Sequence, residues 1–257
     1  MTRRVRTFGR IAAGLGLALV LGRPVVAEDK TSPALDGESR FNAGLDHLRA
    51  GRIDLAVAEF KTAIRQDPKN PYFEKGLGLA YARQNKLAEA IAAFRKALDL
   101  NPYYVDVRND LGSVLVLSGR REEGKKEFLT AFNDPTNPSP ELSARNLGQA
   151  YLEEKNYSQA LNWFQTSLSK SATYSDAYLG VADTLVAMGK LNDAIVQLEA
   201  GARALPEEWS VIVALGEAYY RAGRFADART RLELAAGKDP VGPAGRRAAE
   251  LLRNFPK

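Results

Sequence analysis

A repeat of 34 residues constrains the fold of this chain more than any other feature of its sequence. Copies that start at residues 37, 71, 105, 141, 175 and 209 share the same kind of side chain at four positions. Positions 8, 20 and 27 hold small residues, and position 24 holds a large apolar one. Position 8 reads Gly44, Gly78, Gly112, Gly148, Ala182 and Gly216, and position 24 reads Phe60, Phe94, Phe128, Phe164, Leu198 and Leu232. Such a period indicates stacked copies of one small structural unit.

The shared positions have a physical reason. Two antiparallel helices approach closely only where their side chains are small, and the large residue at position 24 fills the space beside that contact. Glycine or a polar residue near position 15 ends the first helix, and proline at position 32 ends the second. The pattern resembles the tetratricopeptide repeat across residues 37–242. This resemblance implies an all-α fold, an α-solenoid of six tandem helix-turn-helix repeats in one continuous domain.

The period also divides the rest of the chain. The six repeats cover 37–70, 71–104, 105–138, 141–174, 175–208 and 209–242, with Ser139 and Pro140 inserted between the third and the fourth. Residues 28–36 are expected to form a short polar leader. Residues 243–257 place apolar side chains on one helical face and arginines elsewhere, which predicts a C-terminal capping helix over the last repeat.

The first 27 residues are typical of an export signal peptide. They contain five arginines, no acidic residue and an apolar run from Ile11 to Gly22. A helix of that length rises only about 18 Å, short of the ~30 Å hydrocarbon core of a bilayer. Small residues at Val25 and Ala27 predict cleavage after Ala27. An uncleaved N-terminal anchor is the alternative interpretation.

Composition narrows the classes of partner. The chain has 36 Lys and Arg against 31 Asp and Glu, and five of the basic residues lie in the export signal. Residues 28–257 therefore carry 36 − 5 = 31 basic and 31 acidic residues, a balance that argues against a nucleic-acid partner. The absence of cysteine excludes disulfides, thiolate metal sites and a lipid-modified N-terminal cysteine.

No motif in the sequence indicates catalysis. Gly76-x-Gly78 lies inside a predicted first helix, without the preceding strand that a dinucleotide-binding loop requires. The single histidine, His47, occupies a position where other repeats place Tyr or Leu, so packing explains it better than metal binding. We therefore predict that the chain is not an enzyme and has no catalytic residues, metal site or cofactor.

The resemblance to the tetratricopeptide repeat implies a partner-binding groove lined by the first helix of each repeat. Its lining mixes aliphatic and polar side chains, which suits an amphipathic helix or an extended apolar segment of a protein partner. We favour the groove of repeats 3 and 4, with repeats 1 and 2 next; the alternative is that these residues only shape the joints between repeats. The candidates are Asn109, Ser113, Val116, Arg145, Gln149 and Leu152, then Phe41, Leu45, Lys75 and Leu79.

A second resemblance is narrower. The segments Asn109-Asp110-Leu111-Gly112, Asp134–Glu141 and Asn146-Leu147-Gly148 are similar to the joint between the third and fourth repeats of the type IV pilus secretin-pilotin family (PilF/PilW/Tgl-like). Members of that family are outer-membrane lipoproteins, whereas this chain lacks the cysteine that carries the lipid. The resemblance implies binding of a secretin subunit or another envelope component, without direct membrane insertion after signal cleavage.

The expected function is therefore a non-enzymatic, periplasmic protein–protein interaction module. It would assist the assembly or stability of an envelope machine such as a type IV pilus secretin, either free in the periplasm or held at the outer membrane by its partner. The alternative is a general periplasmic scaffold of a secretion or polysaccharide-export complex.

Overall fold

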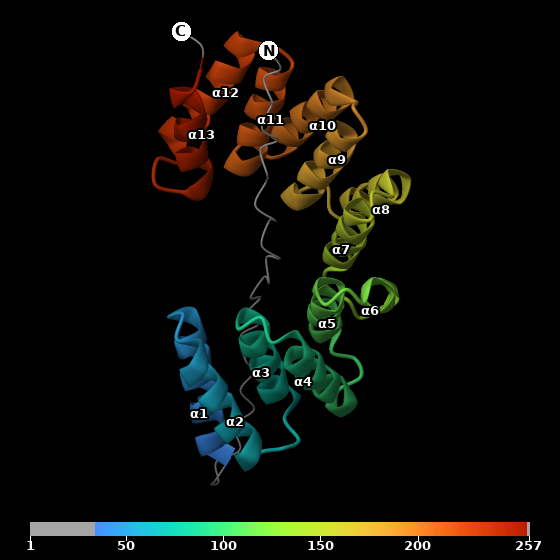
Figure 1. Ribbon diagram of the computed structural model, residues 1–257, viewed down its shortest axis with the longest axis vertical. Helices are drawn as coiled ribbons and strands as arrows, with labels where there is room; N and C mark the ends of the chain where they lie inside the picture. The colour runs from blue at the N-terminus through green and yellow to red at the C-terminus, as the bar shows by residue number, and fades with distance from the viewer. Residues whose placement is uncertain (1–33, 256–257) are drawn as a thin grey trace, which may run out of the picture. The chain divides into compact units, whose positions relative to one another are not determined.

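The computed structural model describes residues 34–255, which contain helices and no strand. The predicted export signal and residues 28–33 of the predicted leader lie outside the described residues. The helices within this range (Figure 1) are α1 (Ala34–Arg49), α2 (Ile53–Gln66), α3 (Pro71–Arg83), α4 (Leu87–Leu100), α5 (Val105–Leu117), α6 (Arg121–Asn133), α7 (Pro140–Glu153), α8 (Tyr157–Lys170), α9 (Ser175–Ala187), α10 (Leu191–Ala204), α11 (Trp209–Arg221), α12 (Phe225–Lys238) and α13 (Pro243–Arg253).

The helices follow the 34-residue period closely. Four of the first helices, α3, α5, α9 and α11, begin at position 1 of their repeats. The helix α1 begins earlier, at Ala34, so the helix extends into the segment that we expected to be a leader. The helix α7 begins at the inserted Pro140, because proline has no N–H to leave unpaired and its φ suits the first turn of a helix.

Position 15 ends the first helix in every repeat with a left-handed backbone conformation. The φ angles are 72° at Gly51, 85° at Gly119, 75° at Gly189 and 76° at Gly223, and the same conformation occurs at Asn85 (58°) and Lys155 (60°). A residue in this conformation stops the helical hydrogen-bond ladder and turns the chain back toward the second helix.

The described residues of the solenoid group into two compact units. The first unit ends at Ser118 and contains α1–α5; the second begins at Gly119 and contains α6–α13. The boundary falls in the turn of the third repeat. In a solenoid each repeat packs only on its neighbours, so the fold does not require one core shared by all copies.

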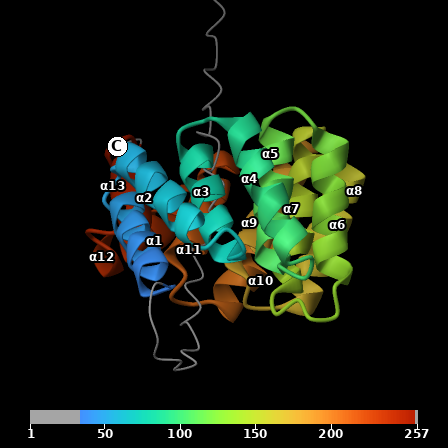
Figure 2. The same cartoon turned by 90° about the horizontal axis from the view of Figure 1, so that it is seen from below.

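A phenylalanine ring held between two glycines organises the first unit. Phe60 of α2 is fully buried, and α2 packs against both α1 and α3 (Figures 1 and 2). A Cβ atom placed on Gly44 of α1 or Gly76 of α3 would lie 2.6 Å or 2.7 Å from Cε1 of this ring. Glycine at both positions therefore lets two first helices close on one aromatic side chain.

The second unit repeats this arrangement around Phe164 of α8. A Cβ atom on Gly148 of α7 would lie 2.8 Å from the ring, and one on Gly180 of α9 would collide with it still more severely. At the C-terminal end, α13 buries Ala248 and packs Leu251 and Leu252 against a cluster from α11 and α12. The last repeat thus has its apolar face covered by a helix.

Candidate partner-binding site

The predicted groove residues lie on the first helices of the repeats, α1, α3 and α5 in the first unit and α7, α9 and α11 in the second. Within each unit these first helices contact one another in sequence, α1 with α3, α3 with α5, α7 with α9, and α9 with α11. The candidate residues of repeats 3 and 4 belong to different units, so each half is described on its own.

The aliphatic and aromatic candidates of repeats 1 and 2 mostly pack inside the first unit. The Phe41 ring lies 5.6 Å from Phe60 and 5.2 Å from Phe73 between ring centroids. Leu45 is half-buried against the same core, and Leu79 is buried. These three side chains hold α1 and α3 together, whereas Tyr72, at position 2 of repeat 2, is 55% exposed.

Lys75 forms a polar contact between two repeats. Its Nζ lies 3.5 Å from the Asp106 carboxylate at the start of α5 and 4.9 Å from the centre of the Tyr104 ring. The Tyr72 ring meets Tyr104 edge-on at 5.3 Å. Burial raises the pKa of the Tyr104 hydroxyl, so this tyrosine stays neutral. The four side chains form one cluster, of which Tyr72 is the exposed member.

The two polar candidates of α5 donate hydrogen bonds within the helix. Asn109 is buried and directs its amide Nδ2 toward the Val105 carbonyl at 3.5 Å. The buried Ser113 hydroxyl donates to the Asn109 carbonyl at 3.0 Å. Val116, one turn beyond, is half-buried.

The α7 candidates are likewise engaged within the second unit. The Arg145 guanidinium lies 3.1 Å from the Asp176 carboxylate of α9, and only 13% of its side chain is exposed. Gln149 donates to Glu153 at 3.1 Å, and Leu152 is half-buried against the core of this unit. Partner contact by these residues stays a prediction.

The two units share a motif that the sequence analysis missed. Lys75 and Arg145 both occupy position 5, and each pairs with an aspartate at position 2 of the next repeat. A tyrosine at position 34, Tyr104 or Tyr174, accompanies each pair; the Arg145 charge lowers the pKa of the Tyr174 hydroxyl, against the larger rise caused by burial. Tyrosine at position 34 followed by aspartate at position 2 was the signal available in the sequence.

The insertion between repeats 3 and 4 is held by specific hydrogen bonds in the second unit. The Asn137 amide donates to the Ala131 carbonyl at 2.7 Å and to the Ser143 hydroxyl at 3.3 Å, joining the end of α6 to the start of α7. Its side-chain oxygen accepts from the Ser139 N–H at 2.8 Å. These contacts fix the path of the Asp-Pro-rich segment that carries the narrower resemblance.

Two general features of residues 34–255 limit the chemistry that we assign. Within that range, no group of His, Asp and Glu side chains is arranged to hold a metal ion. Every helix in the same range is too short or too polar to span a bilayer.

Comparison with known proteins places the repeats in a family. Models of the tetratricopeptide repeat match residues 41–105, 81–144 and 151–210. Together these ranges cover more than half of the chain. The chain therefore belongs to the tetratricopeptide repeat family, and its all-α solenoid fold is confirmed.

Relatives within this family include pilus proteins. The type IV pilus assembly protein PilF of Pseudomonas aeruginosa is 26% identical over 187 residues, which are 72% of this chain and 73% of that protein. The crystal structure of PilW, a widely conserved type IV pilus biogenesis factor, covers 83% of this chain and 98% of its own, with a TM-score of 0.65 at 20% identity. The structure of Pseudomonas aeruginosa PilF covers 86% of this chain and 98% of its own, with a TM-score of 0.64 at 20% identity.

These relatives confirm the narrower resemblance, and the structural matches at this identity establish the fold. The chain is a tetratricopeptide protein-interaction module related to the type IV pilus biogenesis factors PilF and PilW.

Proposed function

We propose that the mature chain is an exported, non-enzymatic module that binds a protein component of a type IV pilus machine, such as a secretin subunit, and assists its assembly. The observation that carries this proposal is the similarity to the pilus assembly protein PilF along 72% of the chain. The fixed insertion between α6 and α7 supports it, because this segment carries the family resemblance.

The second candidate function is a periplasmic scaffold that holds several components of a secretion or polysaccharide-export complex. The presence of two units favours the scaffold function, because each unit has its own row of first helices on which a separate component could bind. Affinity purification with the tagged mature chain from solubilised envelopes separates the two functions. Recovery of one outer-membrane channel supports the pilus proposal, whereas recovery of a mixed inner-membrane complex supports the scaffold and overturns it.

Export is tested separately. We expect cleavage after Ala27, since an arginine-rich start, a short apolar run and a Val-x-Ala ending are what signal peptidase recognises. N-terminal sequencing of the protein from the periplasmic fraction should begin at Glu28. A full-length chain that remains in the inner membrane contradicts cleavage and supports the uncleaved anchor.

For the groove we propose that the exposed Tyr72 acts together with the side chains beside it on α3 and at the start of α5. Tyrosine is enriched among the residues that dominate protein interfaces, because its ring supplies a large contact area with little loss of side-chain freedom. We expect Tyr72→Ala to weaken partner binding about tenfold or more.

A matched control for this substitution is Tyr103→Ala. Tyr103 is 76% exposed and lies in the turn before α5, outside the first helices that line the predicted groove. Binding is measured by titration with the purified partner, and the melting temperature of each variant is recorded. Equal loss in both variants, or no loss in Tyr72→Ala, removes Tyr72 from the site.

A further inference from the structure

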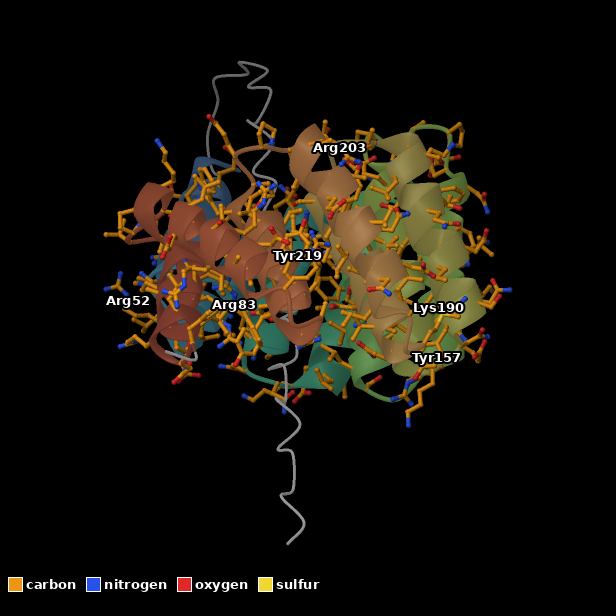
Figure 3. The ribbon with its side chains drawn as sticks, turned by 90° about the horizontal axis from the view of Figure 1, so that it is seen from above. Arg52, Arg83, Tyr157, Lys190, Arg203 and Tyr219 are labelled. Atoms are coloured by element: carbon orange, nitrogen blue, oxygen red, sulfur yellow. The ribbon has the colours of Figure 1, made fainter. Side chains whose placement is uncertain are left out.

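A cavity of about 370 Å³ lies within the second unit, among α10, α11 and α12. It is lined by Glu199, Ala202, Arg203, Leu215, Tyr219 and Arg231. Figure 3 labels Arg203 and Tyr219, which come from α10 and α11. The volume is typical of small-molecule pockets. Its residues occupy positions 7, 11, 23, 25, 28 and 29 of their repeats, whereas the candidate groove residues occupy positions 5, 9 and 12. The cavity is therefore distinct from the candidate groove.

One small residue accounts for the cavity. Position 28 of the second helix holds Ile64, Leu98, Phe132 and Leu168 in the first four repeats, and alanine in the fifth and sixth, Ala202 and Ala236. Ile64 and Leu98 pack against the core of the first unit, and Leu168 packs against that of the second. Alanine at this position of the fifth repeat lacks the atoms that fill the corresponding space in the first four repeats, so it leaves room between α10 and α11.

The single carboxylate in the wall is already satisfied. The Tyr219 hydroxyl donates to Glu199 at 2.7 Å, and the Arg224 guanidinium lies 3.8 Å from the same carboxylate. Arg224 also stacks over the Tyr219 ring, 4.1 Å from its centre. Burial and the bond to Glu199 raise the pKa of Tyr219, which keeps its proton in place. The Glu199 carboxylate therefore already has two partners, the Tyr219 hydroxyl and the Arg224 guanidinium.

Two arginines in the wall lack an acidic partner. Arg203 and Arg231 form no ion pair among residues 34–255, although Arg231 lies close enough to Tyr219 for its charge to affect that hydroxyl. Glu199 is already paired with Arg224, so the lining contains two guanidinium groups that this carboxylate does not neutralise. Guanidinium groups bind planar oxyanions through paired hydrogen bonds.

We propose that this cavity binds a carboxylate group carried on a small apolar moiety. The two guanidinium groups match the paired oxygens of a carboxylate, and Ala202 provides the apolar contact. The carboxylate can come from a free organic acid or from a glutamate or aspartate side chain of a protein partner. The cavity would then form a second binding site, independent of the groove.

The test uses the mature chain and two probes. N-acetylleucine supplies a free carboxylate beside an apolar side chain, and the capped dipeptide acetyl-Leu-Glu-amide supplies only a side-chain carboxylate. The neutral acetyl-Leu-Gln-amide is the control ligand. Binding is followed by NMR through the Ala202 methyl group and the Nε–H groups of Arg203 and Arg231.

Three variants complete the design. Ala202→Leu introduces the residue that the second and fourth repeats have at this position, and should fill the cavity while the melting temperature is kept or raised. Arg231→Gln should weaken binding about tenfold or more, because it removes a charge-assisted hydrogen bond. Arg253→Gln makes the same change on the exposed end of α13, outside the cavity, and should leave binding unchanged.

We expect saturable shifts with at least one carboxylate probe, lost in Ala202→Leu and weakened in Arg231→Gln. Tighter binding of the dipeptide assigns the site to a protein partner, and tighter binding of N-acetylleucine assigns it to a free acid. No saturable shift with either probe, equal shifts with the glutamine dipeptide, or full binding by Ala202→Leu overturns the proposal.

Discussion

Gly180→Ala is expected to lower the free energy of unfolding by about 1–3 kcal/mol, although alanine is normally the better helix former. The reason is the Phe164 ring, which is fully buried and has Gly148 on one side and Gly180 on the other. A methyl group at Gly180 collides with this ring. The ring cannot turn away without meeting α7, so the backbone of α9 must shift.

A glycine on another helix of the same unit serves as the control. A Cβ atom on Gly237 of α12 has no atom within 4 Å, so Gly237→Ala should raise the stability by up to about 1 kcal/mol. Denaturant unfolding of both variants gives the comparison. Adding Phe164→Leu to Gly180→Ala should recover part of the loss beyond what additivity gives. Stabilisation by both alanine variants contradicts this description of the core.

Asp110→Asn is expected to stabilise the protein at pH 8 and to have little effect near pH 4. Burial raises the pKa of the Asp110 carboxyl from 3.8 to about 7; the nearby Lys75 opposes this rise and Asp106 adds to it. Between these two values the folded protein holds a proton that the unfolded chain releases. The free energy of unfolding of the wild type therefore falls as the pH rises from about 4 to about 7, and levels off above that.

The size of this effect follows from the same pKa values. A difference of about three pH units corresponds to at most about 4 kcal/mol, which Asp110→Asn should recover at pH 8. Asp99→Asn, at an exposed position of α4, is the matched control and should leave the pH profile unchanged. Unfolding curves measured from pH 4 to pH 8 that are parallel for wild type and Asp110→Asn contradict the assignment.

Features shared by all six repeats were accessible from the sequence. The left-handed turn at position 15 and the large residue at position 24 recur in every copy, so the period alone located the helices of each repeat. Features present in only one or two copies could not be predicted from the sequence. Gly76 and Gly180, at position 6, face the same rings as the position 8 glycines Gly44 and Gly148, but most repeats have another residue there.

The contacts of the candidate site residues could not be predicted from the sequence either. Lys75 and Arg145 were assigned to partner contact, and the structure places each of them against an aspartate of the next repeat. Position 5 of one first helix faces position 2 of the next, a relation that depends on how neighbouring repeats stack. A pattern read along one repeat contains no information about that contact. The cavity beside Ala202 depends likewise on position 28, which is large and apolar in the first four repeats and alanine in the last two.

Site-specific photocrosslinking in living cells shows directly whether the groove binds an envelope protein. A photoreactive phenylalanine replaces Tyr72 in one strain and Tyr103 in another, both with exposed side chains in the same unit. We expect a crosslink to one pilus-machine protein from position 72 and none from position 103. Crosslinks of equal strength from both positions, or from position 103 alone, would contradict it.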